Sequence, residues 1–175
     1  MTIIKELQTA RLKPRPFKWG CISVLIRKAT PEDLAMIRTL EAATETAAHW
    51  AEREYDALFA ADAPRRIALV AAAECGAQIL GFVIARCAAE EWEIENVVVA
   101  FDQRRRGLGS ALVRELVQEA RRSGAASVLL EVRASNAAAR RLYEKIGFDQ
   151  IGSRPGYYRN PQEDALLWRI SISIP

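Results

Sequence analysis

The sequence is poor in the residues that build metal centres and covalent cross-links. It has a single histidine, His49, and three cysteines among 175 residues. The cysteines, Cys21, Cys75 and Cys87, form no CxxC pair, so they predict neither a disulfide framework nor a zinc ribbon. We expect them to be small apolar fillers in a reducing compartment, and we expect the protein to use no metal.

Long apolar runs are also lacking. The longest uncharged stretches cover residues 67–73 and 75–85, far short of the ~20 apolar residues that span a bilayer. The segment before residue 21 contains neither the apolar region nor the cleavage site of a secretory signal. We therefore expect no membrane segment and a cytoplasmic location.

Outside the N-terminus the chain lacks an excess of one charge. It carries 25 basic and 22 acidic residues, of which five basic and one acidic lie before residue 21. The remainder is nearly neutral, which excludes the broad basic surface of a nucleic-acid-binding protein. The scattered charges around Pro14 and Pro16 predict an N-terminal extension over residues 1–22, disordered or trimmed, rather than a segment that docks on an anionic partner.

What is present fits one globular domain over residues 23–175. Half of the residues are hydrophobic and 27% are charged, which is typical of a folded chain and not of a disordered one. The length is sufficient for one sizeable core but too short for two full-sized domains.

The apolar periods predict a mixed sheet flanked by helices. Thr30 and Pro31 are typical of a helix start, and helical spacing of apolar residues extends from Gly107 to Gly124. We expect strands at residues 23–29, 67–73, 79–87, 91–99, 127–133, 148–153 and 165–172, and helices at 30–43, 48–60, 107–124 and 136–145. The strand, helix and strand between residues 91 and 133 require a right-handed crossover if the strands are parallel neighbours. The predicted fold class is α/β or α+β, with a mostly antiparallel sheet that has parallel central strands.

A basic, glycine-containing loop joins the strand that ends in Val97, Val98 and Val99 to the next helix. The loop residues are Arg104, Arg105, Arg106, Gly107, Leu108, Gly109 and Ser110. Unpaired N–H groups and the helix dipole favour an anion at such a junction, and glycines let a phosphate approach the main chain. The loop lacks the lysine of a P-loop and the third glycine of a dinucleotide fingerprint. Another phosphate carrier or a solvated basic turn remain as interpretations.

A second motif decides between these interpretations. Residues 130–148 read LEVRASNAAARRLYEKIGF, and with the loop they resemble the GNAT superfamily of acetyl-CoA-dependent N-acetyltransferases. The loop matches R/Q-x-x-G-x-G, and residues 136–148 match N-x-x-A-x-x-L-Y-x-x-x-G-F. The later Tyr157-Tyr158 and Glu163-Asp164-Ala165 are similar to the ribosomal-protein alanine N-acetyltransferases of that superfamily. The resemblance covers about residues 23–172 and implies a single GNAT domain.

The resemblance also implies the reaction and its residues. Acetyl-CoA would be the cosubstrate, and the α-amino group of a protein, most simply a ribosomal protein that begins with alanine, would be the acceptor. Glu131 matches the family's general base and Tyr143 its general acid. The implied coenzyme ligands are the backbone of Val97, Val98 and Val99, the amides of Arg104, Arg105, Arg106, Gly107, Leu108, Gly109 and Ser110, and Asn136. Trp50, Tyr157 and Tyr158 would lie at the acceptor.

The residues alone leave the catalytic roles open. Asn136 and Tyr143 are seven residues apart, so they share one face of a helix, and Glu131 alternates with the apolar residues of its strand. Without the motif, a strand glutamate and a helix tyrosine are more often a rim residue and a core aromatic. Glu93 and Glu95 are rival bases, because strand periodicity predicts that they share a face with residues 97 and 99.

The acceptor is the least determined part of the prediction. His49 and Ala51 flank Trp50 where relatives commonly have proline and serine, and Pro155-Gly156 replaces a basic, amide-bearing pair. An α-amino group with a pKa of ~7.7–8.0 loses its proton more easily than a lysine with a pKa of ~10.4, which favours a protein N-terminus. A small-molecule amine, or a non-catalytic acyl-CoA-binding module, are the alternatives. We expect a monomer or weak dimer without direct nucleic-acid contact.

Overall fold

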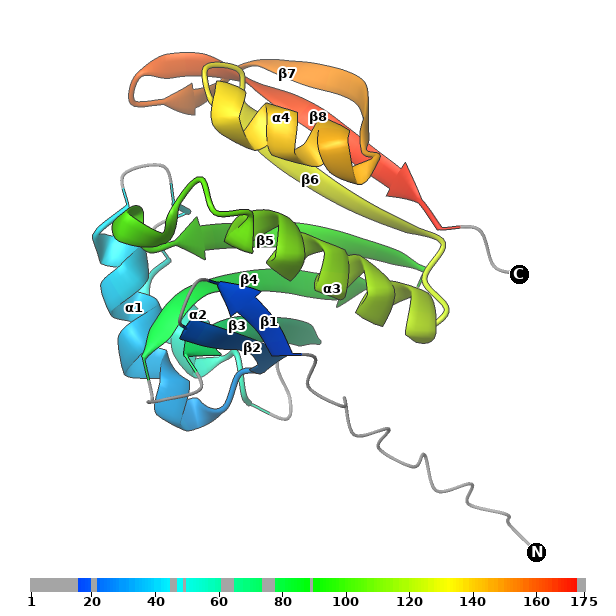
Figure 1. Ribbon diagram of the computed structural model, residues 1–175. Coiled ribbons are helices and arrows are strands. Elements are labelled where there is room, and N and C mark those ends of the chain that lie inside the picture. Colours follow the sequence, from blue (N-terminus) through cyan, green and yellow to red (C-terminus); the bar gives the residue numbers. More distant parts are fainter. Residues whose placement is uncertain are drawn as a thin grey trace, which may run out of the picture.

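The structure is a computed structural model that describes residues 16–19, 22–44, 47–48, 50–60, 65–73, 78–88 and 90–172. The described residues form an eight-stranded sheet in the order β1-β2-β3-β4-β5-β6-β8-β7 (Figure 1). The strands are β1 Pro16–Trp19, β2 Ile22–Lys28, β3 Arg66–Ala73, β4 Ile79–Ala88, β5 Glu91–Val99, β6 Ser127–Arg133, β7 Asp149–Arg159 and β8 Gln162–Ser171. Neighbouring strands are antiparallel except for β5 and β6, which are parallel. The predicted fold class is confirmed.

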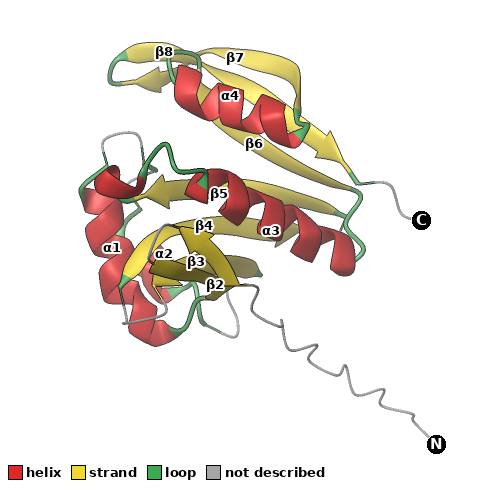
Figure 2. Ribbon diagram, viewed as in Figure 1, coloured by secondary structure: helices red, strands yellow, loops and turns green. Residues whose placement is uncertain are grey.

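Helices cover both faces of the sheet (Figure 2). They are η1 Pro31–Asp33, α1 Leu34–Ala42, α2 Glu52–Asp56, η2 Phe101–Gln103, α3 Leu108–Arg122 and α4 Ala137–Ile146. One core cluster joins α3 and α4 to the sheet through residues such as Leu112, Leu116 and Tyr143. The other joins α1 and α2 to the opposite face through Ile37 and Tyr55. The sheet is therefore the middle layer of three.

Strand β4 is the centre of this arrangement. Its first seven residues are all buried, which is the pattern of a strand covered on both faces rather than on one. Its alternate residues belong to the two different core clusters: Val83 packs on the α3 side, and Phe82 and Ile84 pack on the α1 side.

The parallel pairing of β5 with β6 is short. It runs from Glu91 opposite Ser127 to Ile94 opposite Leu130 and then stops, although both strands continue. Figure 1 shows the two strands moving apart beyond this point. The second half of β5 keeps its antiparallel partner β4, and the second half of β6 keeps β8. The sheet is thus continuous at one end and split at the other.

Two predicted elements in the first half of the chain differ in the structure, and β7 continues to Arg159, beyond the predicted strand end at residue 153. The helix predicted over residues 48–60 is reduced to α2, because the backbone N–H of Trp50 donates to the carboxylate of Glu41 and Ala51 is extended. Strand β1 lies inside the predicted extension over residues 1–22 and pairs with β2. Residues 1–15 and 20–21, like His49, lie outside the described residues, so the domain boundary at residue 22 stays a prediction.

Close packing at Gly81 gives a test of the fold. A Cβ at Gly81 would lie 2.7 Å from the carbonyl oxygen of Val98 and 3.3 Å from the Cα of Val99. We expect Gly81→Ala to lower the free energy of unfolding by about 1–3 kcal/mol, because two backbones must move apart. Denaturant titration measures this, with Gly152→Ala as the control, since a Cβ at Gly152 meets no atom within 4 Å. Equal stabilities of the two variants would contradict the packing described for β4 and β5.

Candidate active site

The loop before α3 and the start of the helix have backbone donors without a partner in the described part of the chain. The N–H groups of residues 105–110 find no hydrogen-bond acceptor among the described residues, and the first helical bond runs from the N–H of Ala111 to the oxygen of Gly107 at 3.0 Å. Arg105 and Gly107 have left-handed φ angles of 64° and 80°, so the backbone turns sharply in front of the helix. The predicted anion site therefore has the free amides and the helix N-terminus that it requires.

Gly109 allows the helix start to lie close to its neighbours. A Cβ at this position would lie 3.0 Å from Cδ1 of Leu142 in α4 and 3.6 Å from Cγ2 of Val99. Leu108 and Gly109 are buried while Gly107 is exposed. The loop is consequently anchored at its end by packing and open along its amides.

The adjoining strand has further backbone groups that do not pair with β4. The N–H of Ala100 donates to the oxygen of Leu80 in β4 at 2.9 Å. Because successive residues of a strand point their backbone groups to opposite sides, those of Val97 and Val99 point away from β4, toward the split in the sheet. Val98 lies between them with its side chain buried on the α1 side.

Arg104 turns back toward the strand. Its Nε donates to the oxygen of Val99 at 3.1 Å, and its Nη2 donates to Oγ1 of Thr44 after α1 at 3.3 Å. Its guanidinium also lies 5.4 Å from the ring centre of the exposed Phe101. The side chain of Arg104 therefore ties the loop to β5 and α1, while Arg105 and Arg106 are exposed and extend the positive charge of the loop.

Glu131 lies where the sheet splits. It follows Leu130, the last residue of β6 that pairs with β5, and its side chain is 19% exposed. The burial pattern of β6 alternates, so Glu131 shares a face with Leu129 and Arg133 as predicted. A carboxylate at this position reaches the opening from the face opposite the α3 and α4 cluster.

Tyr143 approaches from α4. Its ring is buried in the core cluster and lies 5.7 Å from the ring of Phe148. Burial, with a smaller contribution from Tyr158, raises the pKa of Tyr143 above its usual range. The phenol therefore keeps its proton through neutral pH, as a proton donor must.

The tyrosine pair of β7, Tyr157 and Tyr158, is influenced by the carboxylate of Glu131. Burial and then the carboxylate of Glu131 raise the pKa of Tyr158, and the same carboxylate is the largest cause that raises the pKa of Tyr157. The two tyrosine rings meet edge to face at 5.2 Å. Glu131 and Tyr143 thus have Tyr158 as a common electrostatic neighbour, whereas no direct contact between them is present.

Two arginines that the sequence analysis did not select belong to this group. Arg133 stacks 4.0 Å from the ring centre of Tyr158 and donates to the oxygens of Asn160 and Pro161 in the β7–β8 turn. Arg154 forms an ion pair with Glu131 at 3.1 Å. Charge alone could not have distinguished them among the 25 basic residues.

Asn136 is the N-cap of α4. Its side-chain oxygen accepts a hydrogen bond from the N–H of Ala139 at 3.1 Å, which satisfies one of the free donors of the helix start. The oxygen is therefore used within the protein, and a contact of Asn136 with the coenzyme stays a prediction.

The rival bases point elsewhere. Between β4 and β5 the register shifts, so that Glu95 is an extra residue in β5. Val97 and Val99 pack toward the α3 cluster, whereas Glu95 forms a bidentate pair with Arg66 at 2.7 and 3.0 Å, and Arg66 stacks on Trp50. The expectation that Glu95 shares a face with residues 97 and 99 is therefore wrong, because a bulge reverses the alternation after it.

Glu93 precedes the bulge and the split. It lies directly opposite Arg86 of β4 and pairs with it, and its neighbour on the other side is Leu129 in the continuous part of the sheet. Glu131 and Glu95 are thus the candidate bases that lie beyond the last β5–β6 pair, and Glu95 is held in its bidentate pair with Arg66.

Trp50 belongs to the α1–α2 side. Its backbone N–H reaches Glu41, and its ring lies 5.5 Å from that of Tyr55 and 5.1 Å from the guanidinium of Arg66. The buried Glu41 also accepts a hydrogen bond from Asn96 of β5 at 2.6 Å. This network fixes the segment around Trp50 to β5, and its contact with an acceptor stays a prediction.

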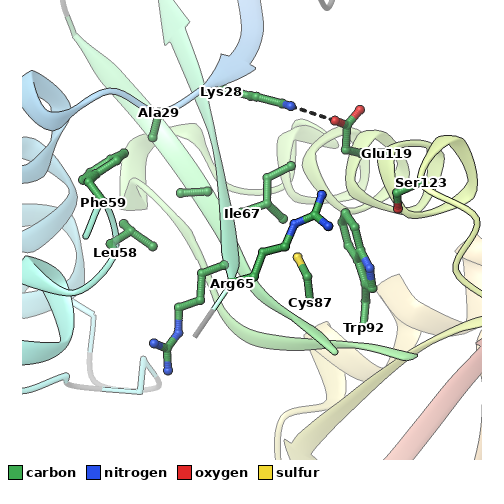
Figure 3. A pocket seen from close by; sticks show the side chains of 12 residues that line it. Lys28, Ala29, Leu58, Phe59, Arg65, Ile67, Cys87, Trp92, Glu119 and Ser123 are labelled. Atoms are coloured by element: carbon green, nitrogen blue, oxygen red, sulfur yellow. Dashed lines mark ion pairs between the residues drawn. The ribbon is translucent and has the colours of Figure 1, made fainter. Parts of the chain in front are cut away.

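A pocket of about 210 Å³ is lined in part by Arg66, the residue that stacks on Trp50 (Figure 3). It is lined by Trp92 at the start of β5, by Cys87, and by Glu119 near the end of α3, which pairs with Lys28 at 2.9 Å. Burial raises the pKa of the Cys87 thiol to about 11, so the thiol is protonated at neutral pH. The pocket is smaller than the ~300–1,000 Å³ usual for ligand sites and contains none of the predicted site residues.

Comparison with known proteins identifies the family. The family model of the acetyltransferase (GNAT) family matches residues 34–148. The chain belongs to the GNAT family. It is accordingly an acetyl-CoA-dependent N-acetyltransferase, and the predicted enzyme class is confirmed.

Individual relatives agree with this assignment. The chain is 39% identical over 99 residues to the [ribosomal protein bS18]-alanine N-acetyltransferase of Escherichia coli K12, an alignment that covers 55% of this chain and 67% of the relative. The crystal structure of the ribosomal-protein-S18-alanine N-acetyltransferase from Escherichia coli superposes with a TM-score of 0.75 and 30% identity, covering 87% of this chain and 96% of that one. Arabidopsis thaliana NAA60 shares the fold, with a TM-score of 0.75 at 19% identity, and covers 87% and 99% of the two chains.

The described residues were expected to contain neither a membrane-spanning helix nor a metal-binding cluster. No helix in the described ranges is long and apolar enough to cross a membrane. Within the same ranges, histidine, cysteine, aspartate and glutamate side chains form no group of three that could hold a metal ion.

The backbone at Gly107 provides a test of the loop. We expect Gly107→Leu to weaken acetyl-CoA binding at least tenfold, because a side chain there crowds the amides and strains a left-handed residue. Gly124 ends α3 with nearly the same φ, 79° against 80°, and has no atom within 4 Å of a Cβ. Gly124→Leu therefore carries similar strain away from the loop. Calorimetric titration should show weaker binding in the first variant alone, and equal affinities would argue against the loop as the coenzyme site.

Proposed function

We propose that the protein transfers the acetyl group of acetyl-CoA to the α-amino group of a protein, with ribosomal protein bS18 and its N-terminal alanine as the acceptor. The observation that carries the proposal is the split sheet, which has free amides at residues 105–110 on one side and Glu131 with the tyrosine pair on the other. The named activity of the Escherichia coli relative supports the choice of acceptor.

The coenzyme supplies an activated acetyl thioester to this split. The free N–H groups of residues 105–110 hold its pyrophosphate. The backbone groups of Val97 and the N–H of Val99, whose oxygen already accepts from Arg104, hold the pantetheine arm. A backbone N–H of this strand then faces the carbonyl oxygen of the thioester, where negative charge develops during attack. Arg105 and Arg106 add attraction for the phosphates.

Glu131 takes the proton of the acceptor. An α-amino group requires a weaker base than a lysine does, since their reference pKa values are ~7.7–8.0 and ~10.4. The carboxylate of Glu131, directly or through a water, accepts this proton, and the neutral amine attacks the thioester carbon. As the new C–N bond forms, the C–S bond breaks, and the nitrogen loses a second proton, which balances the proton taken up by the departing thiolate.

Tyr143 gives a proton to the departing thiolate. Its raised pKa means that it carries the proton at neutral pH. The thiolate, whose thiol has a reference pKa of ~8.5, is a stronger base than the Tyr143 phenolate only if the site stabilises that phenolate during the reaction. A hydrogen bond donated to the phenolate would supply this stabilisation, and Tyr158 is our candidate donor because it is an electrostatic neighbour of Tyr143. Tyr157 and Trp50 border the acceptor.

The two catalytic assignments are tested by removing one proton-transfer group at a time. We expect Tyr143→Phe and Glu131→Gln each to lower kcat by about 10²–10⁴, the usual range for a general acid or base, with acetyl-CoA affinity changed little. Tyr55→Phe is the control, because it also removes a buried hydroxyl, one without a hydrogen-bond partner among the described residues. Turnover of either catalytic variant at the level of Tyr55→Phe would remove that residue from the mechanism.

The acceptor is tested by product analysis. The protein is incubated with acetyl-CoA and a panel of alanine-initiated bS18 peptides, N-terminally blocked peptides that contain lysine, and small-molecule amines. We expect a mass increase of one acetyl group on the α-amino nitrogen of the alanine peptide. Acetylation confined to a small amine would favour the alternative acceptor class, and coenzyme binding without any product would favour a non-catalytic module.

The setting follows from the acceptor. A ribosomal protein substrate places the enzyme in the cytoplasm, where reduced cysteines are expected. We propose that it acts as a monomer or weak dimer that meets the acceptor as a protein chain, without contacting nucleic acid directly.

A further inference from the structure

The ion pair between Arg154 and Glu131 occupies the group to which we assign base catalysis. Nη1 of Arg154 lies 3.1 Å from Oε1 of Glu131, and the guanidinium lies 5.5 Å from the ring centre of Tyr157. A cation is thus already bound to the carboxylate that the positively charged acceptor amine must reach. The inference below rests on the proposed role of Glu131.

The shape of β7 brings this arginine to Glu131. Glu131 lies opposite Leu167 of β8, which in turn lies opposite Gly152 of β7, so the nearest β7 position in this row carries no side chain. Arg154, two residues further on, lies opposite Ala165, and a long side chain can cross this small residue diagonally toward β6.

An irregularity after Arg154 adds Tyr157 to the same site. Three residues of β7, Pro155 to Tyr157, occupy the space opposite the single residue Asp164. The turn is fixed by Gly156, which has a φ of 60° and donates its N–H to Oδ1 of Asp164 at 2.8 Å. In a regular strand residues 154 and 157 would point to opposite faces, whereas here the guanidinium and the ring are neighbours.

The two side chains of this ion pair differ in exposure, which allows the pair to open. The side chain of Arg154 is 54% exposed and can move into solvent, while that of Glu131 is 19% exposed and stays in the split. The Arg66–Glu95 pair is the contrast within this protein, since it is bidentate and its side chains are only 14% and 18% exposed. An exposed single-contact pair contributes little to stability and is readily exchanged.

We propose that Arg154 is an internal substitute for the acceptor: it pairs with Glu131 in the free enzyme and is displaced by the ammonium form of the acceptor amine. It returns once acetylation has removed the charge of the amine and Glu131 has released the proton it took to solvent. No bond forms or breaks in this exchange, because one cation replaces another on the same carboxylate. The acetylated product is a neutral amide and cannot compete with the guanidinium, so the return of Arg154 favours product release.

Acceptor binding tests the exchange directly. The probe is an alanine-initiated bS18 peptide titrated by calorimetry into the enzyme saturated with CoA, so that no turnover occurs. We expect Arg154→Ala and Arg154→Gln to tighten peptide binding about twofold to fivefold, the effect of one exposed ion pair, and Arg154→Lys to bind like the parent. Arg159→Ala, an exposed arginine of the same strand, should change nothing.

A double-mutant cycle separates competition at Glu131 from a structural effect. In a Glu131→Gln background the Arg154→Ala change should no longer tighten binding. Unchanged or weaker binding in both Arg154→Ala and Arg154→Gln, or equal tightening in the Glu131→Gln background, would overturn the inference. If the product panel shows another amine as the acceptor, that amine replaces the peptide as the probe. In that case the proposed acceptor would be wrong, but the same titration with the other amine would still test the role of Arg154.

Discussion

The structure depends on where the backbone pairing between β5 and β6 ends. Four residue pairs hold the two parallel strands together, and beyond them each strand keeps a partner on its outer side only. Backbone donors and acceptors are obligatory hydrogen-bonding groups. Apart from the oxygen of Val99, which accepts from Arg104, the inner-side groups beyond this point therefore bind either water or a ligand with amide groups of its own. Pantetheine is such a ligand, and the family to which the chain belongs uses it.

The chemistry of the site is divided between the two sides of this split. The β5 side carries main-chain donors at the start of a long helix, which suit a phosphate-bearing carrier. The β6 side carries a carboxylate and two tyrosines, which suit a charged amine, together with the arginine that pairs with this carboxylate. Tyr143 comes from α4, which the core cluster joins to α3 and to the sheet. Acetyl-CoA and the acceptor amine, which enter from different sides, can meet at the sulfur end of the coenzyme without competing for the same protein groups.

The sequence predicted the regular elements well where a single rule determines them. Strand β6 has the predicted bounds, Ser127 to Arg133, because it is a buried apolar run between polar ends, and α3 ends before Gly124 as its spacing indicated. The bulge at Glu95 could not be predicted, since it depends on the pairing of two strands and not on the sequence of one. The continuation of β7 was missed because Pro155 and Gly156 are typical of a strand end; at the edge of a sheet both are tolerated. The partner of Glu131, Arg154, was missed for the same reason.

The account is tested most directly by hydrogen exchange of the backbone amides with and without acetyl-CoA. Free amides at residues 105–110 and the inward-facing amides of Val97 and Val99 should exchange rapidly in the free protein and become protected when acetyl-CoA binds. The residues around the pocket of Cys87 and Trp92 should show no change. Binding of acetyl-CoA without protection of residues 97–110, or with protection confined to that pocket, would contradict the split between β5 and β6 as the coenzyme site.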